Sequence, residues 1–177
     1  MNMIIRLAAI NDIFEIEKFY NAVIDYANDN INYCGWKKGI YPARKDIEQD
    51  ISEGTIYIAF VNGEISGAIV LNHEPTQSPD NGSWMIDAKD EEVFNVRRFA
   101  VHPDFWGQKV GKLLLEFSYN LAKKRGIKAL RLDVFKDNMP AIKSYEKCGY
   151  SYIDTVDLGL GCYGLDLFRL YEKLVEQ

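Results

Sequence analysis

The feature that most constrains the fold is a strand, a glycine-bearing turn and a helix that follow one another within residues 92–126. Residues 92–101 read as a strand. The helix after the turn is marked by apolar residues at helical spacing: Val110, Leu113, Leu114, Phe117 and Leu121. Gly126 stands where a helix C-cap belongs, and residues 129–135 form an apolar strand. This order predicts a strand–helix–strand crossover within a sheet.

The rest of the chain adds strands and helices on both sides of this unit. Residues 3–7 predict a strand, and residues 12–15 resemble a capping box that opens a helix. Pro42 is placed to open a second helix. The strands at 55–61 and 64–71 flank Asn62-Gly63, a dipeptide that strongly favours a hairpin turn. Pro140 opens a last helix, and residues 150–156 and 165–174 close the chain as strands. The order β-α-α-β-β-β-α-β-α-β-β predicts an α/β fold with a mixed sheet and helices on both faces.

Composition and charge narrow the class of protein. A length of 177 residues with 47% hydrophobic residues suits one globular domain, residues 1–177. The net charge of −5 and the absence of a basic run argue against nucleic-acid binding. No apolar run is long enough to cross a membrane, and the first residues lack a signal-peptide layout. Cys34, Cys148 and Cys162 are widely spaced, which argues against a metal cluster or a disulfide framework and favours the cytoplasm.

A first candidate site is the turn between the strand and the helix, residues 99–112. Helix N-termini present unpaired N–H groups and a partial positive charge, which suit a pyrophosphate. Glycine lets the backbone approach phosphates closely. The alternative is a plain connection in which glycine serves only the turn.

A second candidate segment is residues 133–150. Asn138 immediately precedes a helix start, and Tyr145 follows seven residues later, two helical turns on. Both side chains are therefore expected to face the same groove. The structural alternative makes Asn138 a capping residue and Tyr145 a half-buried aromatic.

Together the two segments resemble the signatures of the GNAT N-acetyltransferase superfamily. The first resemblance lies in the lead-in Val101-His102-Pro103-Asp104 and the turn that ends at Gly111. The second lies in the Asn-x-x-Ala-x-x-x-Tyr-x-x-x-Gly-Tyr run that starts at Asn138. Where the family has Arg or Gln and then Gly, this chain has Trp106 and Lys109. The resemblance implies a GNAT-like fold, with a mostly antiparallel sheet of about seven strands.

The resemblance also implies a co-substrate and site residues. Acetyl-CoA would be bound without a metal by these residues: Phe99, Ala100, Val101, Trp106, Gly107, Gln108, Lys109, Val110, Gly111, Lys112, Asn138 and Tyr145. The strand would carry a bulge near Phe99, where an N–H polarises the thioester carbonyl. Tyr145 would protonate the departing thiolate.

The general base and the acceptor site are less constrained. We expect a water relay through Glu74 or His73, with the alternative that His73 is only an exposed loop residue. Aromatic walls of the acceptor pocket are expected from Trp36, Tyr41 and Trp84, with Asp87 meeting a cationic group. Trp36 and Tyr41 could equally pack the first two helices together. The long loop at residues 72–91 is expected to contribute to this pocket.

The function predicted on this basis is acetyl transfer from acetyl-CoA to a primary amine of a small molecule by direct attack. Two alternatives stay open: acetylation of a protein N-terminus or lysine, and a CoA-binding regulatory module without turnover. A homodimer is left open as the oligomeric state.

Overall fold

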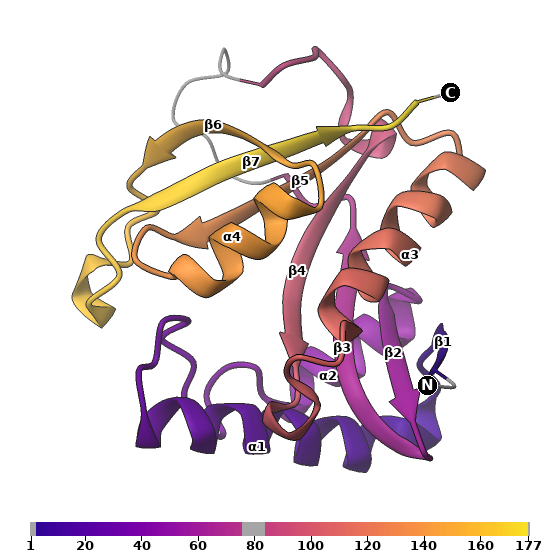
Figure 1. Ribbon diagram of the computed structural model, residues 1–177, viewed down its shortest axis with the longest axis vertical. Helices are drawn as coiled ribbons and strands as arrows, with labels where there is room; N and C mark the ends of the chain where they lie inside the picture. Colours follow the sequence, from indigo (N-terminus) through magenta and orange to yellow (C-terminus); the bar gives the residue numbers. More distant parts are fainter. Residues whose placement is uncertain (1–2, 76–83, 177) are drawn as a thin grey trace. The chain divides into compact units, whose positions relative to one another are not determined.

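The protein is described here by a computed structural model that covers residues 3–75 and 84–176 (Figure 1). The chain divides into two compact units. In the described part, unit 1 comprises residues 3–32, 36–71 and 97–117. Unit 2 comprises residues 33–35, 72–75, 84–96 and 118–176. Among the described elements, two strands and one helix contain residues of both units, and each unit is described separately below.

The described elements form a single sheet with the strand order β1-β2-β3-β4-β5-β7-β6. The strands are β1 (Met3–Leu7), β2 (Ile56–Val61), β3 (Glu64–Asn72), β4 (Val93–Val101), β5 (Ala129–Phe135), β6 (Ser151–Val156) and β7 (Phe168–Leu174). The helices are α1 (Ile13–Asp29), α2 (Arg44–Glu53), α3 (Val110–Lys124) and α4 (Met139–Lys147). The pair β4–β5 is parallel, whereas β1–β2, β2–β3, β5–β7 and β6–β7 are antiparallel. The predicted element order and the mixed, mostly antiparallel sheet are confirmed.

In unit 1 the hairpin between β2 and β3 turns at the predicted dipeptide. Asn62 has φ 53° and Gly63 has φ 86°, and Val61 pairs with Glu64 across the turn. Two consecutive residues with positive φ are what a type I′ turn requires.

Helices cover both faces of the sheet in unit 1. On one face, α1 and α2 build a core with alternate residues of β2 and β3: Ile16, Phe19, Tyr20, Ile47, Ile56, Ile58, Ala68 and Val70. On the other face, Phe117 of α3 lies 5.1 Å from the Tyr57 ring. Successive strand residues point to opposite faces, so the apolar run of β2 is explained by helices on both sides.

Unit 2 is built on β5, β7 and β6. Here β7 lies between β5 and β6 and is antiparallel to both, so the crossover through α4 spans one intervening strand. The first residues of β4 pair in parallel with β5, from Val93 opposite Ala129 to Asn95 opposite Arg131. None of the described helices is both long and apolar enough to cross a membrane.

Two local predictions are wrong. The capping box at residues 12–15 does not form, because the Asp12 carboxylate accepts hydrogen bonds from the Ala9 N–H (2.7 Å) and the Arg6 guanidinium (2.7 and 2.8 Å). The last strand begins at Phe168 rather than at residue 165, since a short 3-10 helix (Gly161–Tyr163) and Gly164 at φ 81° precede it.

Gly67 offers a test of the packing between β3 and α3. A methyl group at this position would lie 2.7 Å from Leu114 Cδ1 and 3.1 Å from the Ala100 carbonyl oxygen. We expect Gly67→Ala to lower the free energy of unfolding by about 1–3 kcal/mol, because the backbone oxygen cannot move aside. Thermal unfolding checks this as a Tm lower by several degrees. The control Gly161→Ala has no atom within 4 Å and should change Tm little. Equal Tm values for the two variants would contradict the packing described.

Candidate functional site

The turn before α3 has the backbone shape expected of a phosphate-binding loop. Within unit 1, β4 ends at Val101, a 3-10 turn spans Pro103–Phe105, and α3 starts at Val110. Gly107 has φ 76° and Lys109 has φ 65°. Turns that mix right- and left-handed residues gather N–H groups into anion-binding concavities, and the first turn of a helix adds its own N–H groups.

Lys109 takes the backbone conformation that a glycine would take in its place. A left-handed conformation costs a non-glycine residue about 1–3 kcal/mol. Lys109 adopts this conformation although the family pattern has glycine at its place, and it adds an exposed ammonium group to the turn.

Trp106 fastens the turn to its surroundings within unit 1. Its indole Nε1–H donates to the carbonyl of Val101 (3.0 Å), and its ring meets the Tyr26 ring of α1 edge-on at 4.7 Å. The indole thus supports the turn where the family pattern has a polar side chain. The carbonyl of Val101 already accepts this bond, but a carbonyl oxygen has a second lone pair for another donor.

Gly111 lies where α3 packs closely on β4. A Cβ atom here would be 3.3 Å from Phe99 Cζ and 3.3 Å from Val101 Cγ2. A side chain at Gly111 would therefore crowd Phe99 and Val101, which favours glycine here independently of any approach of phosphate. No sequence pattern revealed this second reason.

The backbone irregularity expected near Phe99 lies at Arg98, which has φ 45° inside β4. A left-handed residue within a strand is typical of a β-bulge. The Arg98 side chain bonds to Asp50 of α2 and to the Tyr41 hydroxyl. Sequence reasoning missed Asp50, although a charge on the same helical face as Ile47 was a signal that it meets a buried partner.

In unit 2, Asn138 caps α4. Its Oδ1 accepts a hydrogen bond from the Ala141 N–H (3.3 Å), as expected of an N-cap residue. Its Nδ2 lies 3.9 Å from Cys34 Sγ. The capping role is thus the one seen among the described residues, and cofactor binding by Asn138 stays a prediction.

Tyr145 is buried on α4, with 7% of its surface exposed. Its ring lies 5.8 Å from Tyr150 and 6.5 Å from Tyr171. Burial raises the pKa of the Tyr145 phenol, and the neighbouring Cys34, Tyr150 and Asp133 raise it further. A phenol with an ordinary pKa near 10 is already protonated at neutral pH, so the raised pKa leaves Tyr145 protonated but makes it a weaker acid.

His73 and Glu74 follow β3 in unit 2, and both are exposed. His73 Nδ1 lies 2.8 Å from the Val93 carbonyl oxygen and 3.1 Å from that of Asp90. Carbonyls only accept, so in the neutral ring Nδ1 carries the proton and Nε2 keeps a lone pair. Glu74 accepts a bond from Asn72 Nδ2 (3.2 Å). In the neutral ring, Nε2 is therefore the nitrogen of His73 that can accept a proton.

The residues predicted to line an acceptor pocket do not gather in one unit. Trp36 and Tyr41 lie in unit 1, with their rings 6.3 Å apart. Trp36 also packs against the core at Tyr20, 5.7 Å away, which agrees with a packing role. Tyr41 is partly exposed and its hydroxyl accepts from Arg98.

Trp84 and Asp87 lie in unit 2. The Arg131 guanidinium lies 4.4 Å above the Trp84 ring, and Arg131 also donates to the buried carboxylate of Glu172 (2.7 Å). Trp84 thus stacks on a buried ion pair, whereas Asp87 is exposed. Residues 76–83 of the long predicted loop lie outside the described residues.

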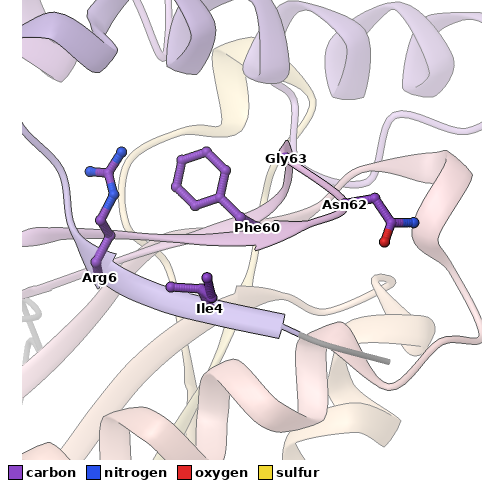
Figure 2. Close-up of a pocket in the computed structure, with 5 residues that line it drawn as sticks. All are labelled: Ile4, Arg6, Phe60, Asn62 and Gly63. Carbon is purple, nitrogen blue, oxygen red and sulfur yellow. The ribbon is translucent and has the colours of Figure 1, made fainter.

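A shallow cavity of about 460 Å³ lies elsewhere in unit 1, at the β1–β2 edge (Figure 2). It is lined by Ile4, Arg6, Phe60, Asn62 and Gly63. The Arg6 guanidinium lies 4.8 Å above the Phe60 ring. None of the predicted site residues lines this cavity, and it has no acid–base pair of its own. In the described ranges, no group of three His, Cys, Asp or Glu side chains could hold a metal ion.

Comparison with known proteins places these features in context. Residues 16–150 match the family model described as Acetyltransferase (GNAT) family. Streptothricin acetyltransferase of Escherichia coli is 29% identical over 134 residues, which cover 74% of this chain and 63% of that protein. The ribosomal protein bS18-alanine N-acetyltransferase of Escherichia coli is 32% identical over 85 residues, or 48% of this chain and 57% of that protein. Each match thus spans less than two thirds of the relative's own length.

A solved structure gives an independent comparison of the fold. PaiA N-acetyltransferase from Thermoplasma acidophilum, in complex with coenzyme A, matches with a TM-score of 0.70 and 20% identity. The match covers 98% of this chain and 100% of that chain. At this identity the likeness concerns the fold alone, and it confirms the predicted GNAT-like architecture.

The left-handed conformation of Lys109 can be tested by stability. Lys109→Gly and Lys109→Ala both remove the ammonium group, but only glycine relieves the positive φ. We expect the glycine variant to be more stable than the alanine variant by about 1 kcal/mol, which is a Tm difference of roughly 2–4 °C. Thermal unfolding of both variants measures this difference. An alanine variant as stable as the glycine variant would mean that the turn has another conformation.

Proposed function

The chain belongs to the acetyltransferase (GNAT) family, and from this premise we propose that it transfers the acetyl group of acetyl-CoA to a primary amine of a small molecule. The observation that carries the proposal is the turn before α3, where Gly107 and Lys109 both have left-handed backbone. A turn of this shape favours a phosphate site, which acetyl transfer and a CoA-binding module without turnover both require. The choice between these two rests on the family and on the transfer assay below.

In this proposal the two halves of acetyl-CoA are bound by different parts of the protein. The turn from Gly107 to Lys112 binds the pyrophosphate through backbone N–H groups and the α3 N-terminus. The backbone of β4 between Phe99 and Val101 pairs with the pantetheine arm as an added strand would. The fit is supported by the left-handed residues of the turn and by the close packing at Gly111.

The chemistry that we propose needs one base and one acid. The amine nitrogen attacks the thioester carbonyl carbon after losing a proton to a water relayed through His73 or Glu74. The carbon–sulfur bond then breaks, and Tyr145 gives its proton to the thiolate. The support for His73 is its tautomer, which leaves Nε2 as an acceptor. The support for Tyr145 is its position on α4, two helical turns after Asn138, in the run that resembles the second family signature.

The acceptor class rests on two lines of support. The net charge of −5 favours cationic acceptors such as amines, and the streptothricin acetyltransferase match covers most of this chain. A second candidate is the α-amine of a protein that begins with alanine, favoured by the bS18-alanine N-acetyltransferase match. We place this activity in one domain of a cytoplasmic protein, because the cysteines are widely spaced and the composition is globular.

The acceptor class can be decided by measuring thiol release from acetyl-CoA with two panels. One panel holds small primary amines and the other holds peptides with N-terminal alanine or internal lysine. We expect a higher kcat/KM for at least one small amine than for any peptide. A peptide that exceeds every small amine would favour the second candidate. No transfer to either panel, with acetyl-CoA bound, would favour the regulatory module.

Acetyl-CoA should stabilise the protein through its pyrophosphate. A ligand at 100 times its Kd contributes about 2.7 kcal/mol to folding, so Tm should rise by several degrees. Acetyl-pantetheine, which lacks the pyrophosphate, should raise Tm much less at the same concentration. Differential scanning fluorimetry measures both shifts. An unchanged Tm with acetyl-CoA, and no heat of binding in calorimetry, would rule out this site.

Tyr145→Phe should slow acetyl transfer without weakening acetyl-CoA binding. The variant keeps the ring and its packing but removes the proton, so kcat should fall roughly 10²–10⁴-fold, the usual range for one general acid. The matched control is Tyr150→Phe, which removes another buried phenol that packs on Tyr145 and should leave kcat within a few-fold. Near-normal turnover by Tyr145→Phe would mean that water protonates the thiolate.

A further inference from the structure

The backbone of β4 contains one residue in a conformation that a strand does not favour. Arg98 has φ 45° between extended neighbours. Arginine has no intrinsic preference for this region, unlike glycine or asparagine. Such a conformation persists only where the surrounding structure holds it.

Arg98 is held by its backbone and by its side chain, all within unit 1. The hydroxyl of Tyr20 on α1, a side chain with 1% of its surface exposed, donates to the Arg98 carbonyl oxygen (2.8 Å). Asp50 on α2 accepts two bonds from the guanidinium, one from Nε at 2.8 Å and one from Nη2. The Nη1 group donates to the hydroxyl of Tyr41 (3.0 Å).

The ion pair is buried and each partner depends on the other. Asp50 is 1% exposed and the Arg98 side chain is 14% exposed. Burial lowers the pKa of Arg98, but the hydrogen bonds and charges of Asp50 and Tyr41 together outweigh it and raise that pKa above its ordinary value. Burial also raises the pKa of Asp50, so the carboxyl relies on the guanidinium to stay ionised. A bidentate guanidinium–carboxylate pair fixes the relative orientation of the two side chains as well as the distance between them.

The strand residues that follow Arg98 contact the helix α3. Phe99 and Val101 both pack against Gly111 in the first turn of α3. The left-handed Arg98 thus immediately precedes the stretch of β4 proposed for the pantetheine arm, and that stretch packs on the helix that follows the turn proposed for the pyrophosphate.

We propose that Tyr20 and Asp50 are positioning residues that hold Arg98 in its left-handed conformation, so that the β4 backbone polarises the thioester carbonyl. This inference rests on the proposed function. Neither Tyr20 nor Asp50 touches the reacting atoms; both act through the backbone of Arg98. Because preorganised donors act on charge that develops during reaction, the network should govern kcat more than the affinity for acetyl-CoA.

The test compares three variants by transfer kinetics, by calorimetry with coenzyme A and by the infrared carbonyl stretch of bound acetyl-CoA labelled with carbon-13 at the thioester. Arg98→Ala removes the side chain and keeps the backbone penalty. Arg98→Gly removes the same side chain, but glycine accepts φ 45° without penalty. Tyr20→Phe removes only the bond to the carbonyl. The surface control Arg44→Ala removes an exposed ion pair of α2 with Glu48.

We expect the carbonyl stretch to fall in frequency when acetyl-CoA binds the wild-type protein. Arg98→Ala should lose most of this shift and about 10²-fold in kcat, the order of loss that small misplacement causes. Arg98→Gly should retain roughly tenfold more kcat than Arg98→Ala, because the conformation returns without the side chain. Tyr20→Phe should lose about tenfold in kcat. The Kd for coenzyme A should stay within about twofold throughout, and Arg44→Ala should match the wild type.

Equal losses in Arg98→Gly and Arg98→Ala, with a wild-type carbonyl stretch in both, would overturn the inference. An unshifted stretch in the wild-type protein would overturn it as well. The carbonyl stretch also separates this inference from the proposed function. A protein that binds acetyl-CoA and shifts its stretch, yet acetylates no amine, would refute the proposed function while the variants still decide the role of Arg98.

Discussion

The structure of unit 1 depends on the buried ion pair between Asp50 and Arg98. Three segments far apart in sequence meet there: α1 through Tyr20, α2 through Asp50, and β4 through Arg98 itself. A buried charge pair costs desolvation, and removing one partner leaves the other unpaired at a large penalty. Such a pair adds little net stability because of its desolvation penalty, but its two directed hydrogen bonds favour one backbone geometry. That geometry is the left-handed conformation of Arg98 within β4, next to the proposed thioester site.

In the turn before α3, side-chain contacts and local packing likewise fix the backbone conformation. Lys109 accepts a left-handed backbone, Trp106 donates to the Val101 carbonyl, and Gly111 lets α3 approach the strand. Trp106 thus supports the turn through a hydrogen bond, whereas Lys109 adopts a positive φ at a conformational cost. The strand and the turn are adjacent segments of unit 1, so the proposed sites for pantetheine and pyrophosphate share one framework. In the proposed site, backbone groups of β4 and of the turn bind acetyl-CoA, and side chains hold these backbone groups in position.

Much of the fold was predictable because local sequence determined it. Asn62-Gly63 specified the hairpin through positive φ, and the helical spacing in α3 specified its buried face. The detail at Asp12 was not predictable, because Arg6 on β1 competes for its carboxylate. The partner of Asp50 was not predictable either. Asp50 lies on the same face of α2 as Ile47, which indicated a buried contact, but only the tertiary structure identifies Arg98 as the partner. A bulge was expected near Phe99 from family resemblance. The left-handed conformation found at Arg98 is held by contacts with Tyr20 and Asp50, which are remote in sequence.

The β4 edge and the turn before α3 are proposed to form the coenzyme A site. This location can be measured by titrating nitrogen-15-labelled protein with coenzyme A and following its amide NMR signals. The largest shifts are expected at the amides of Phe99–Val101 and Gly107–Lys112. Largest shifts instead at Ile4, Asn62 and Gly63, around the cavity of Figure 2, would contradict it.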